Sequence, residues 1–561
     1  LQDTKGSFKN LSKYKILNFK KNDSQVKKDI KITQKIYFNL LTDLVKKLNN
    51  FHKRKFSKKY WDIVLGPWLK VFIEIVYERY TSLENALEKK KVNYVVLAKY
   101  DNSDFFTDNV LDLVSKDIKK QDDWNFILYT KIFKFLNKKT KKVLLKSIDI
   151  PKKSKNNYKK KKNFFLIFAG LLSNLLKPFW KKNDFVIYEP DMSVIDTIKI
   201  YLRLGQLPKI NIEPNYKIKP KNIELRKKLF FSKNKVNKIE KFIRSILPDM
   251  LPTDIIENYQ NLDKLSDNLN LPEKPSFVFT AYGYHGKEVF QMWLGKKIEN
   301  KTKYFLCQHG ANHTTSRNTI IESGFKNCDK FFSWGEDKNK KCVALFNTKN
   351  INTNIDFEKN GDKIYFFAPP MYPKRSRPYN DYEKMIKENL EMEKILGGLN
   401  KKIRKKVVIK IYPVPNFQKE FVNKILNEIT FKNRKYEIAD NNGANKKFIY
   451  GKSRIIIHSG DGTSILETLS ADIPSVFIME NLNWIRNSCK KDYKYLVKAK
   501  ILFFDYNKLI NHVNKYYNKI DDWWKNKEVI KAKNNFCNKY CKPAPKNYLN
   551  KLENCIIDNV K

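Results

Sequence analysis

The sequence predicts an α/β protein built from parallel sheets that are covered by helices on both faces. From residue 275 onward, short apolar runs alternate with helical patterns. Continuous apolar strands separated by helices are typical of parallel sheets that are buried on both sides. The chain has 561 residues, which is too long for one core, so about three or four domains are expected.

Residues 1–90 are predicted to form an N-terminal helical extension. Trp68, Phe72 and Ile75 recur at helical spacing. Gly66-Pro67 is a suitable helix start, because proline is tolerated in the first turn.

Residues 91–345 are predicted to form the first Rossmann-like domain, with helical insertions. The lysine run at 151–163 predicts an exposed loop, and helices are expected from about 191 to 270. Apolar runs that end in polar residues or glycine predict its strands at 93–98, 184–190, 276–282, 303–309 and 330–335.

A polar, turn-rich segment near 345–361 predicts a boundary. A second Rossmann-like domain is expected over 361–510. Residues 511–561 predict helices that pack back across the cleft, with Trp523-Trp524 as an apolar anchor. The strands of the second domain are predicted at 362–370, 406–413, 436–440, 454–459, 475–479 and 501–506.

The charge balance leaves two interpretations open. Lys and Arg number 112 against 59 Asp and Glu, a formal net charge of +53. A polyanionic partner is one explanation. Compositional drift is the other, and it explains most of the surplus better, because the excess is largely lysine and runs along the whole chain. No nucleic-acid-binding motif accompanies the charge, so no specific nucleic acid partner is expected.

Cysteine usage and hydropathy favour a cytoplasmic protein. The seven cysteines are irregularly spaced, which is typical of reduced thiols. No signal peptide is recognised at the start of the sequence. The longest apolar stretch, 164–176, is shorter than the ~20 residues that span a bilayer.

A glycine- and hydroxyl-rich turn follows the predicted strand at 454–459 and precedes a helix. Unpaired N–H groups at a helix N-terminus attract anions. The turn therefore predicts a phosphate site at the carboxyl end of a buried strand. The alternative is ordinary N-capping by Thr463 or Ser464 with Glu467 closing a capping box, and the motif alone does not decide between them. The residues of this predicted phosphate site are Ser459, Gly460, Gly462, Thr463 and Ser464.

Histidines gather at the predicted strand ends. The chain has six histidines, and His285, His309, His313 and His458 lie at such ends or just after them. This concentration predicts a working site, in which His309 acts as a general base toward an acceptor hydroxyl or donates a hydrogen bond to a phosphate. His285 is a second catalytic candidate. A structural histidine is the alternative in each case, and His309 with His313 lacks an evident third zinc ligand.

Further cleft residues are expected beside these histidines. Lys410 and Tyr412 share one face of a strand end, where they suit phosphate binding and stacking, although both are common at surfaces. Arg375 and Arg377 follow another strand end and can hold an anion. Gln308 and Gly310 flank His309.

Several motifs together resemble a bacterial family of transferases from O-antigen and other surface-carbohydrate gene clusters. The resemblance covers about 60 to 510 of the chain. More distantly, the His-Gly strand end and the Ser/Thr-x-x-x-Glu helix are similar to capsule Kdo transferases and teichoic-acid polymerases. The motifs occur in this order: Gly66-Pro67-Trp68, Trp124-Asn125, Gln308-His309-Gly310, Trp334-Gly335, Lys410-Ile411-Tyr412-Pro413 and the run 461–474.

The resemblance implies a GT-B-like fold in which two Rossmann-like domains face a cleft and the C-terminal one holds the nucleotide. It implies His309 as the base or as an acceptor-side residue, Thr463 and Ser464 at the donor phosphate, and Glu467 near the donor ribose. The capsule enzymes have a His-Pro pair where this chain has Tyr412-Pro413. Lys410 or His458 would then take over the donor phosphate.

The predicted function is a metal-independent glycosyltransferase that uses a nucleotide-sugar donor, CMP-linked by the distant resemblance, and no cofactor. The acceptor would be a hydroxyl of a lipid-linked or surface glycan such as O-antigen. A non-catalytic nucleotide- or glycan-binding protein is the alternative, and an RNA-binding protein is a weaker one.

Residues 152–180 join a basic cluster to a short apolar segment, which suits peripheral contact with the inner membrane. The favoured alternative for 164–176 is a core helix, because the segment is apolar nearly all round.

Overall fold

The structure is a computed structural model. It describes residues 21–89, 94–118, 122–136, 144–149, 164–211, 213–229, 231, 235–311, 313–317, 322–351, 361–368, 391–411, 436–439 and 446–560. We call residues up to 351 the N-terminal half and those from 361 the C-terminal half.

Three helices open the chain: α1 (Asp23–His52), α2 (Lys58–Val64) and α3 (Gly66–Lys89). The Asn22 side chain accepts a hydrogen bond from the Gln25 N–H and so caps α1. Leucines of α1 and the apolar face of α3 are buried in one core. The predicted helical extension and its start at Gly66 agree with these elements.

A small parallel sheet follows the helical extension. It consists of β1 (Tyr94–Lys99) and β2 (Leu144–Asp149), which pair with each other and with no strand of the larger sheets. The chain between them forms α4 (Val110–Ile118) and α5 (Asp122–Leu136). The predicted strand at 93–98 exists, but it lies outside the main sheet, and β2 was not predicted.

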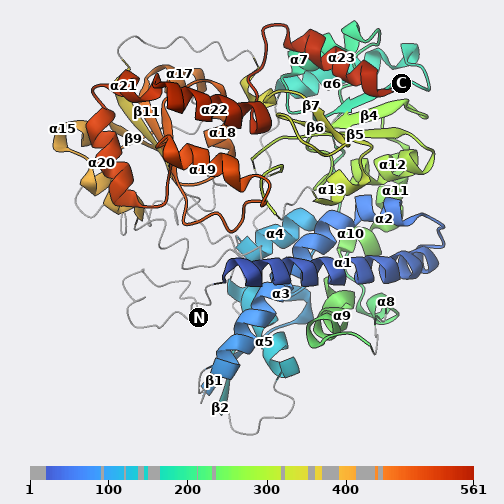
Figure 1. The fold of residues 1–561 in the computed structure, drawn as a ribbon. Helices are drawn as coiled ribbons and strands as arrows, with labels where there is room; N and C mark the ends of the chain where they lie inside the picture. The colour runs from blue at the N-terminus through green and yellow to red at the C-terminus, as the bar shows by residue number, and fades with distance from the viewer. Residues whose placement is uncertain are drawn as a thin grey trace.

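The N-terminal half is organised around a five-stranded parallel sheet (Figure 1). Its spatial order, β3-β4-β5-β6-β7, follows the chain. The three-residue strand β7 was not predicted, whereas the other four strands were. The strands are β3 (Val186–Tyr188), β4 (Phe277–Thr280), β5 (Lys303–Cys307), β6 (Lys330–Ser333) and β7 (Cys342–Ala344).

Alternating side chains cover the two faces of this sheet. Phe185 and Ile187 face a core with helices α7 (Val194–Arg203) and α23 (Tyr548–Val560). Val186 and Tyr188 face the other way, against α12 (Glu288–Glu299), as the two-residue period of a strand requires. The C-terminal helix α23 therefore belongs to the core of the N-terminal sheet (Figure 1).

The C-terminal half contains a six-stranded parallel sheet of order β10-β9-β8-β11-β12-β13. Numbered from β8, this is the order 3-2-1-4-5-6 of a doubly wound Rossmann sheet. The order reverses between β8 and β11, so their carboxyl ends mark the switch point where such sheets bind ligands. The strands are β8 (Lys363–Phe367), β9 (Val407–Lys410), β10 (Glu437–Ile438), β11 (Ser453–His458), β12 (Ser475–Ile478) and β13 (Leu502–Phe503).

All six strands of the second sheet were predicted, and the parallel α/β class is confirmed. The helices not yet named are α6 (Phe164–Leu175), α8 (Ile223–Lys227), α9 (Lys238–Met250), α10 (Thr253–Ile256), α11 (Tyr259–Asp267), α13 (Glu322–Asn327), α15 (Lys401–Arg404), α17 (Lys446–Gly451), α18 (Thr463–Ser470), α19 (Lys490–Lys498), α20 (Tyr506–Tyr516), α21 (Ile520–Trp524) and α22 (Lys527–Tyr540).

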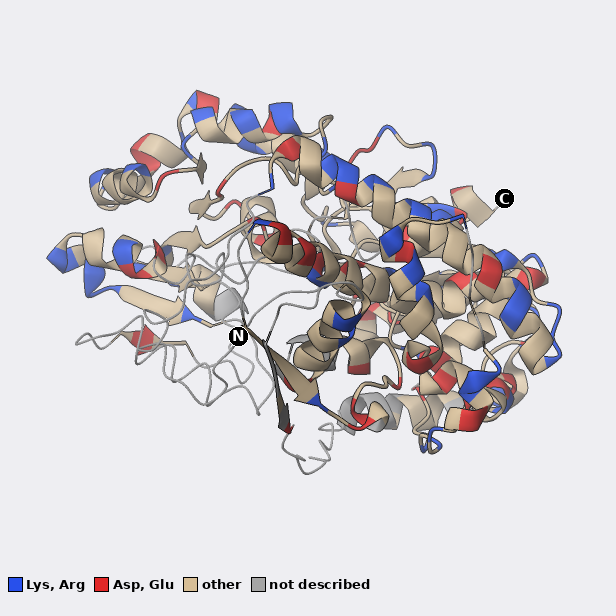
Figure 2. Ribbon diagram, turned by 90° about the horizontal axis from the view of Figure 1, so that it is seen from below, with Lys and Arg blue, Asp and Glu red and all other residues tan. Residues whose placement is uncertain are grey.

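Two expectations about surfaces can be compared with the structure. Lys and Arg residues are spread over both halves in the view of Figure 2 rather than gathered in one stripe. Among the described residues, no helix is long and apolar enough to cross a membrane. The expectation of a buried core helix at 164–176 is wrong, because Leu171 is 59% and Leu175 is 73% exposed in α6.

Candidate functional site

The glycine-rich turn lies at the switch point of the C-terminal sheet. It follows β11 directly, and its Ser459 N–H donates to the Phe367 carbonyl at the end of β8, 3.2 Å away. Among the described residues, a Cβ built on Gly460 meets nothing within 4 Å, and one built on Gly462 meets only the Ser464 Oγ at 4.0 Å. The backbone of this turn is therefore accessible to a ligand.

The capping-box alternative for this turn is wrong. The N-cap of α18 is Gly462, and no side chain caps the helix. The buried Glu467 carboxylate instead accepts a hydrogen bond from the Tyr450 hydroxyl at 3.0 Å. Helix geometry leaves the first N–H groups of α18 without intrahelical partners, and such groups suit an anion.

The Asp461 carboxylate of this turn is engaged by Tyr493 of α19. It accepts a hydrogen bond from the Tyr493 hydroxyl at 2.7 Å, and burial raises its pKa to about 6. A charged carboxylate facing the turn would oppose anion binding, so this pairing favours the phosphate interpretation.

His458 lies against α18 and contacts two of its hydroxyl groups. It is 1% exposed, and its ring nitrogens lie 2.9 Å from the Ser464 Oγ and 3.1 Å from the Thr468 Oγ1. Burial lowers the pKa of His458 to about 3, so the ring is neutral near pH 7. This environment favours a structural role over direct phosphate binding.

Lys410 lies at a neighbouring strand end. It ends β9 beside Phe367 of β8, and its Nζ lies 5.8 Å from the centre of the Phe367 ring. Lys410 therefore remains a candidate for the donor phosphate. The candidates Tyr412, Arg375 and Arg377 lie outside the described residues.

Gln308 fixes the turn after β5 in the N-terminal half. Its buried side chain donates to the Gly310 carbonyl at 3.0 Å and accepts from the Trp334 N–H at 2.9 Å. One amide therefore ties the ends of β5 and β6 together, and it sets the position of His309 between them.

His309 is half-buried in a group of aromatic rings at the carboxyl edge of the N-terminal sheet. Its ring centre lies 4.4 Å from that of Tyr282, 5.5 Å from that of Tyr284 and 4.5 Å from that of His313. Its Nδ1 has no hydrogen-bond partner among the described residues. Burial lowers the pKa of His309 to about 3, assisted by His285 and Lys349.

His285 lies beside this group. Its ring stacks on Tyr284 with centres 4.4 Å apart, and burial lowers its pKa to about 4. The structure thus brings together His285, His309 and His313, whereas it places His458 in the other half.

Three residues of this edge were missed in the sequence. The Lys349 Nζ lies 2.6 Å from the Asp191 carboxylate and 2.6 Å from the Tyr282 hydroxyl. Asp191 has a φ of 62°, which is unusual for a residue other than glycine and often marks functional sites. Asp191 follows the predicted strand at 184–190 and Tyr282 ends the predicted strand at 276–282, which was the available signal.

The two carboxyl edges meet at the turn after His309. The Ala311 N–H donates to the Thr463 Oγ1 at 3.1 Å, and a Cβ built on Gly310 would lie 3.2 Å from that same oxygen. Further along, Ser316 forms an antiparallel bridge with Ile485. The histidine loop is therefore held against the first turn of α18.

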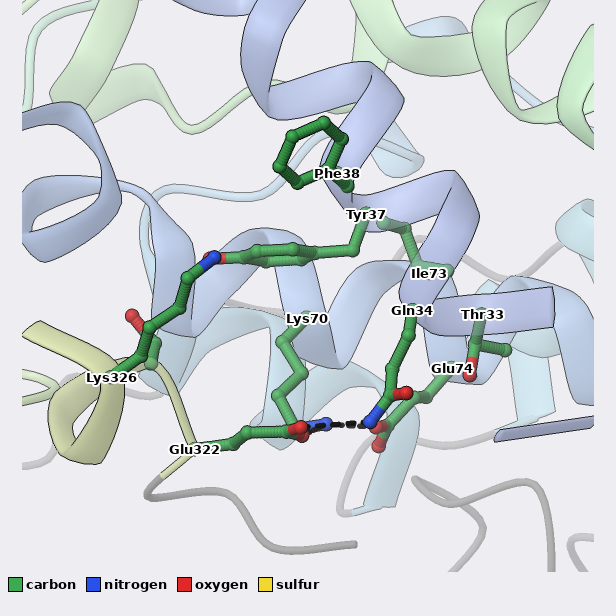
Figure 3. Close-up of a pocket in the computed structure, with 10 residues that line it drawn as sticks. Thr33, Gln34, Tyr37, Phe38, Lys70, Ile73, Glu74, Glu322 and Lys326 are labelled. Carbon is green, nitrogen blue, oxygen red and sulfur yellow. Dashed lines mark hydrogen bonds and ion pairs between the residues drawn. The ribbon is translucent and has the colours of Figure 1, made fainter. Parts of the chain in front are cut away.

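A separate cavity of about 340 Å³ lies among α1, α3 and α13 (Figure 3). Lys70 lies on its floor, with its Nζ 2.7 Å from Glu74 and 2.8 Å from Glu322. Gln34 donates to Glu322 at 2.8 Å, and the Phe38 ring at the rim is 54% exposed. None of the predicted site residues that the structure describes lines this cavity.

Within the described ranges, no group of three or more His, Cys, Asp or Glu side chains is placed to hold a metal ion. Metal independence itself remains a prediction.

The doubly wound order of the six-stranded sheet and the meeting of two carboxyl edges define a class: a GT-B-like protein with two parallel α/β halves. The sequence profile of the LIC12162 family transferases matches residues 1–555. The chain therefore belongs to this family of transferases. A search of curated protein sequences gave no match.

Solved structures give loose superpositions on this chain, so the fold assignment rests on the strand orders. A Listeria monocytogenes protein described as a UDP-N-acetylglucosamine 2-epimerase is 12% identical, with 54% of this chain and 77% of that chain covered and a TM-score of 0.34. MurG of Acinetobacter baumannii is 10% identical, with 71% and 97% covered and a TM-score of 0.32. The spinosyn rhamnosyltransferase SpnG is 10% identical, with 51% and 78% covered and a TM-score of 0.29.

Proposed function

We propose that this protein transfers a sugar from a nucleotide-linked donor to a hydroxyl of a surface glycan such as O-antigen. The main support is the contact between the Ala311 N–H and the Thr463 hydroxyl, 3.1 Å long. It places a loop with a neutral imidazole beside a helix N-terminus suited to phosphate. Membership of a transferase family agrees with this proposal.

In the proposed reaction, His309 takes the proton of the acceptor hydroxyl. The acceptor oxygen bonds to the anomeric carbon while the bond from that carbon to the donor phosphate breaks. The electron pair leaves on the nucleotide phosphate, which the first turn of α18 and Lys410 stabilise. A donor phosphate beside His309 would raise its low pKa, because a nearby negative charge favours the imidazolium.

The nucleotide is proposed to be CMP, and metal is not required. A helix N-terminus and a lysine supply the positive field that a metal ion supplies in other transferases. Unchanged turnover in excess EDTA is the expected result, whereas restoration of an EDTA-inhibited reaction by Mg²⁺ would contradict this part of the proposal.

We propose that the acceptor binds to the N-terminal half, in the cavity among α1, α3 and α13 that Figure 3 shows. The exposed Phe38 ring offers an apolar face to a sugar ring, and Gln34 and Glu322 offer polar groups to its hydroxyls. Phe38→Ala should raise the KM for the acceptor and leave the KM for the donor unchanged. Phe504→Ala is the matched control, since Phe504 is 44% exposed in the C-terminal half.

A lipid-linked acceptor would be met at the cytoplasmic face of the inner membrane, so peripheral contact with that surface is part of the proposal. The function is tested by incubating the full chain with a panel of nucleotide sugars and glycan acceptors and detecting products by mass. Thermal shift with free CMP and UDP runs beside it. Stabilisation by a nucleotide without turnover of any donor would favour the non-catalytic binding protein instead.

A further inference from the structure

Helix α6 presents an unpartnered apolar face to solvent. Leu175 is 73% exposed, Leu171 59%, Phe168 53% and Leu172 46%. With 3.6 residues per turn, these four side chains fall within an arc of about 100°. Phe179, which follows in the next turn of chain, is 72% exposed.

The opposite side of α6 is the one that holds it on the protein. Gly170 and Ser173 are buried there. The Ser173 hydroxyl donates to the Pro208 carbonyl at 3.2 Å and accepts from the Ile210 N–H at 2.8 Å. The helix is therefore docked by its small and polar side, and the four large apolar side chains named above point outward.

Exposed basic residues follow α6 closely in the chain. Lys177 and Lys181 are exposed, and the Lys182 side chain is 82% exposed. The acidic partner is Glu273, 3.4 Å from Lys182 and itself 60% exposed, so that pair is well solvated. In the sequence, a lysine-rich stretch comes just before α6.

We infer that the apolar face of α6, with Phe179 and the lysines 177, 181 and 182, is a docking surface for an anionic lipid bilayer. A second copy of this chain would carry the same positive charge on its face, so charge complementarity favours an anionic surface. The helix lies in the interface plane, with its leucines among the acyl chains and the lysines at the headgroups. The membrane contact itself does not depend on the proposed function. Its role, which is to bring the site to a lipid-linked acceptor, rests on that function.

The test is co-sedimentation of the full chain with vesicles of neutral phosphatidylcholine alone or mixed with anionic phosphatidylglycerol. Binding to the anionic vesicles is expected, weakened by physiological salt relative to low salt. The variant Leu171→Ser/Leu172→Ser/Leu175→Ser should bind roughly tenfold or more weakly. Ile438→Ser is the matched control, since Ile438 is 47% exposed in the other half, and its binding should be unchanged.

Lys181→Gln/Lys182→Gln should weaken binding to the vesicles that contain anionic lipid and should not change binding to the neutral vesicles. Equal pelleting of the serine variant, or no pelleting of the unaltered chain, would overturn the proposal. So would dimerisation in analytical ultracentrifugation that the serine variant abolishes. Turnover with a soluble acceptor should be the same in all variants, so a failure of vesicle binding and a failure of sugar transfer are separate results.

Discussion

The carboxyl edge of the five-stranded sheet carries imidazoles, phenols and a lysine–aspartate pair, whereas that of the six-stranded sheet carries glycines and hydroxyls. His309, Tyr282 and Lys349 belong to the first edge. Gly462, Thr463 and Ser464 belong to the second, where the nearby His458 ring is hydrogen-bonded to hydroxyls of α18.

This difference indicates a division of labour. In the proposed reaction the first edge moves a proton, since it holds a neutral histidine whose Nδ1 is unpartnered among the described residues. The second edge can hold an anion, because a helix begins there at an uncapped glycine. Changes at the first edge should alter turnover, and changes at the second should alter donor binding.

The largest expected effect is on turnover at the first edge. His309→Gln should lower kcat by about 10²- to 10⁴-fold, the usual contribution of a general base, with little change in the KM for the donor. His52→Gln is the control: burial also lowers the pKa of His52, to about 4, but this residue lies in α1. A wild-type kcat in His309→Gln would remove the base from the proposed mechanism.

The second edge should respond in affinity rather than in turnover. Thr463→Val/Ser464→Ala should weaken donor binding by roughly tenfold, because a hydrogen bond to a charged group contributes about 1.5–3 kcal/mol. Ser470→Ala, near the other end of α18, is the control, since its hydroxyl is buried without a partner among the described residues. A lower melting temperature with unchanged donor affinity would show that these hydroxyls serve only the fold.

His458 sharpens the comparison, because it is the histidine of the second edge and its environment is structural. His458→Leu should reduce the free energy of unfolding by about 1–3 kcal/mol, since it leaves the buried Thr468 hydroxyl without the ring as a partner. Urea unfolding followed by circular dichroism measures this. A loss of turnover as large as that of His309→Gln, with no loss of stability, would reverse the assignment.

The smallest expected effect for each residue is on the pH dependence of the free energy of unfolding. It involves histidines at both edges. Burial lowers the pKa of His309 and His458 to about 3 and that of His285 to about 4. Below the unfolded value near 6.5, the unfolded chain binds protons that the native protein does not, so stability falls as the pH falls from 6.5 toward these values. Each histidine should contribute roughly 1 kcal/mol to this loss at pH 5.5.

Unfolding in urea at pH 7.5 and 5.5 checks this sign. The pH-dependent loss should be smaller in His458→Gln than in the unaltered protein. A stability that rises on acidification over this range would contradict the burial of these rings.

Much of the fold could be predicted from the sequence, because long apolar runs were enough to locate β8, β11 and the other strands of the second sheet. Strand β7 was missed although, with three residues, it is no shorter than the predicted strand β3; its side chains are half-buried, whereas those of β3 are buried. The pairing of β1 with β2 in a sheet of their own depends on tertiary contacts, which the pattern of one segment does not contain.

Part of the site was predicted because its strands were predicted. His309 and the turn at 459–464 follow strands, so the rule that ligands bind at strand ends located them. The capping box failed because Glu467 pairs with Tyr450 from another helix, and Lys349 was missed because its partners, Asp191 and Tyr282, are distant in sequence. An all-apolar segment predicted burial for α6, since composition does not show which side finds a neighbour.

The division of labour between the two edges is tested most directly by calorimetric titration of the donor nucleotide into three proteins. These are the unaltered chain, His309→Gln and Thr463→Val/Ser464→Ala. We predict that His309→Gln binds the nucleotide within about twofold of the unaltered chain, because it removes no phosphate ligand, and that the double variant binds it roughly tenfold more weakly. Loss of binding in His309→Gln together with full affinity in the double variant would contradict the account.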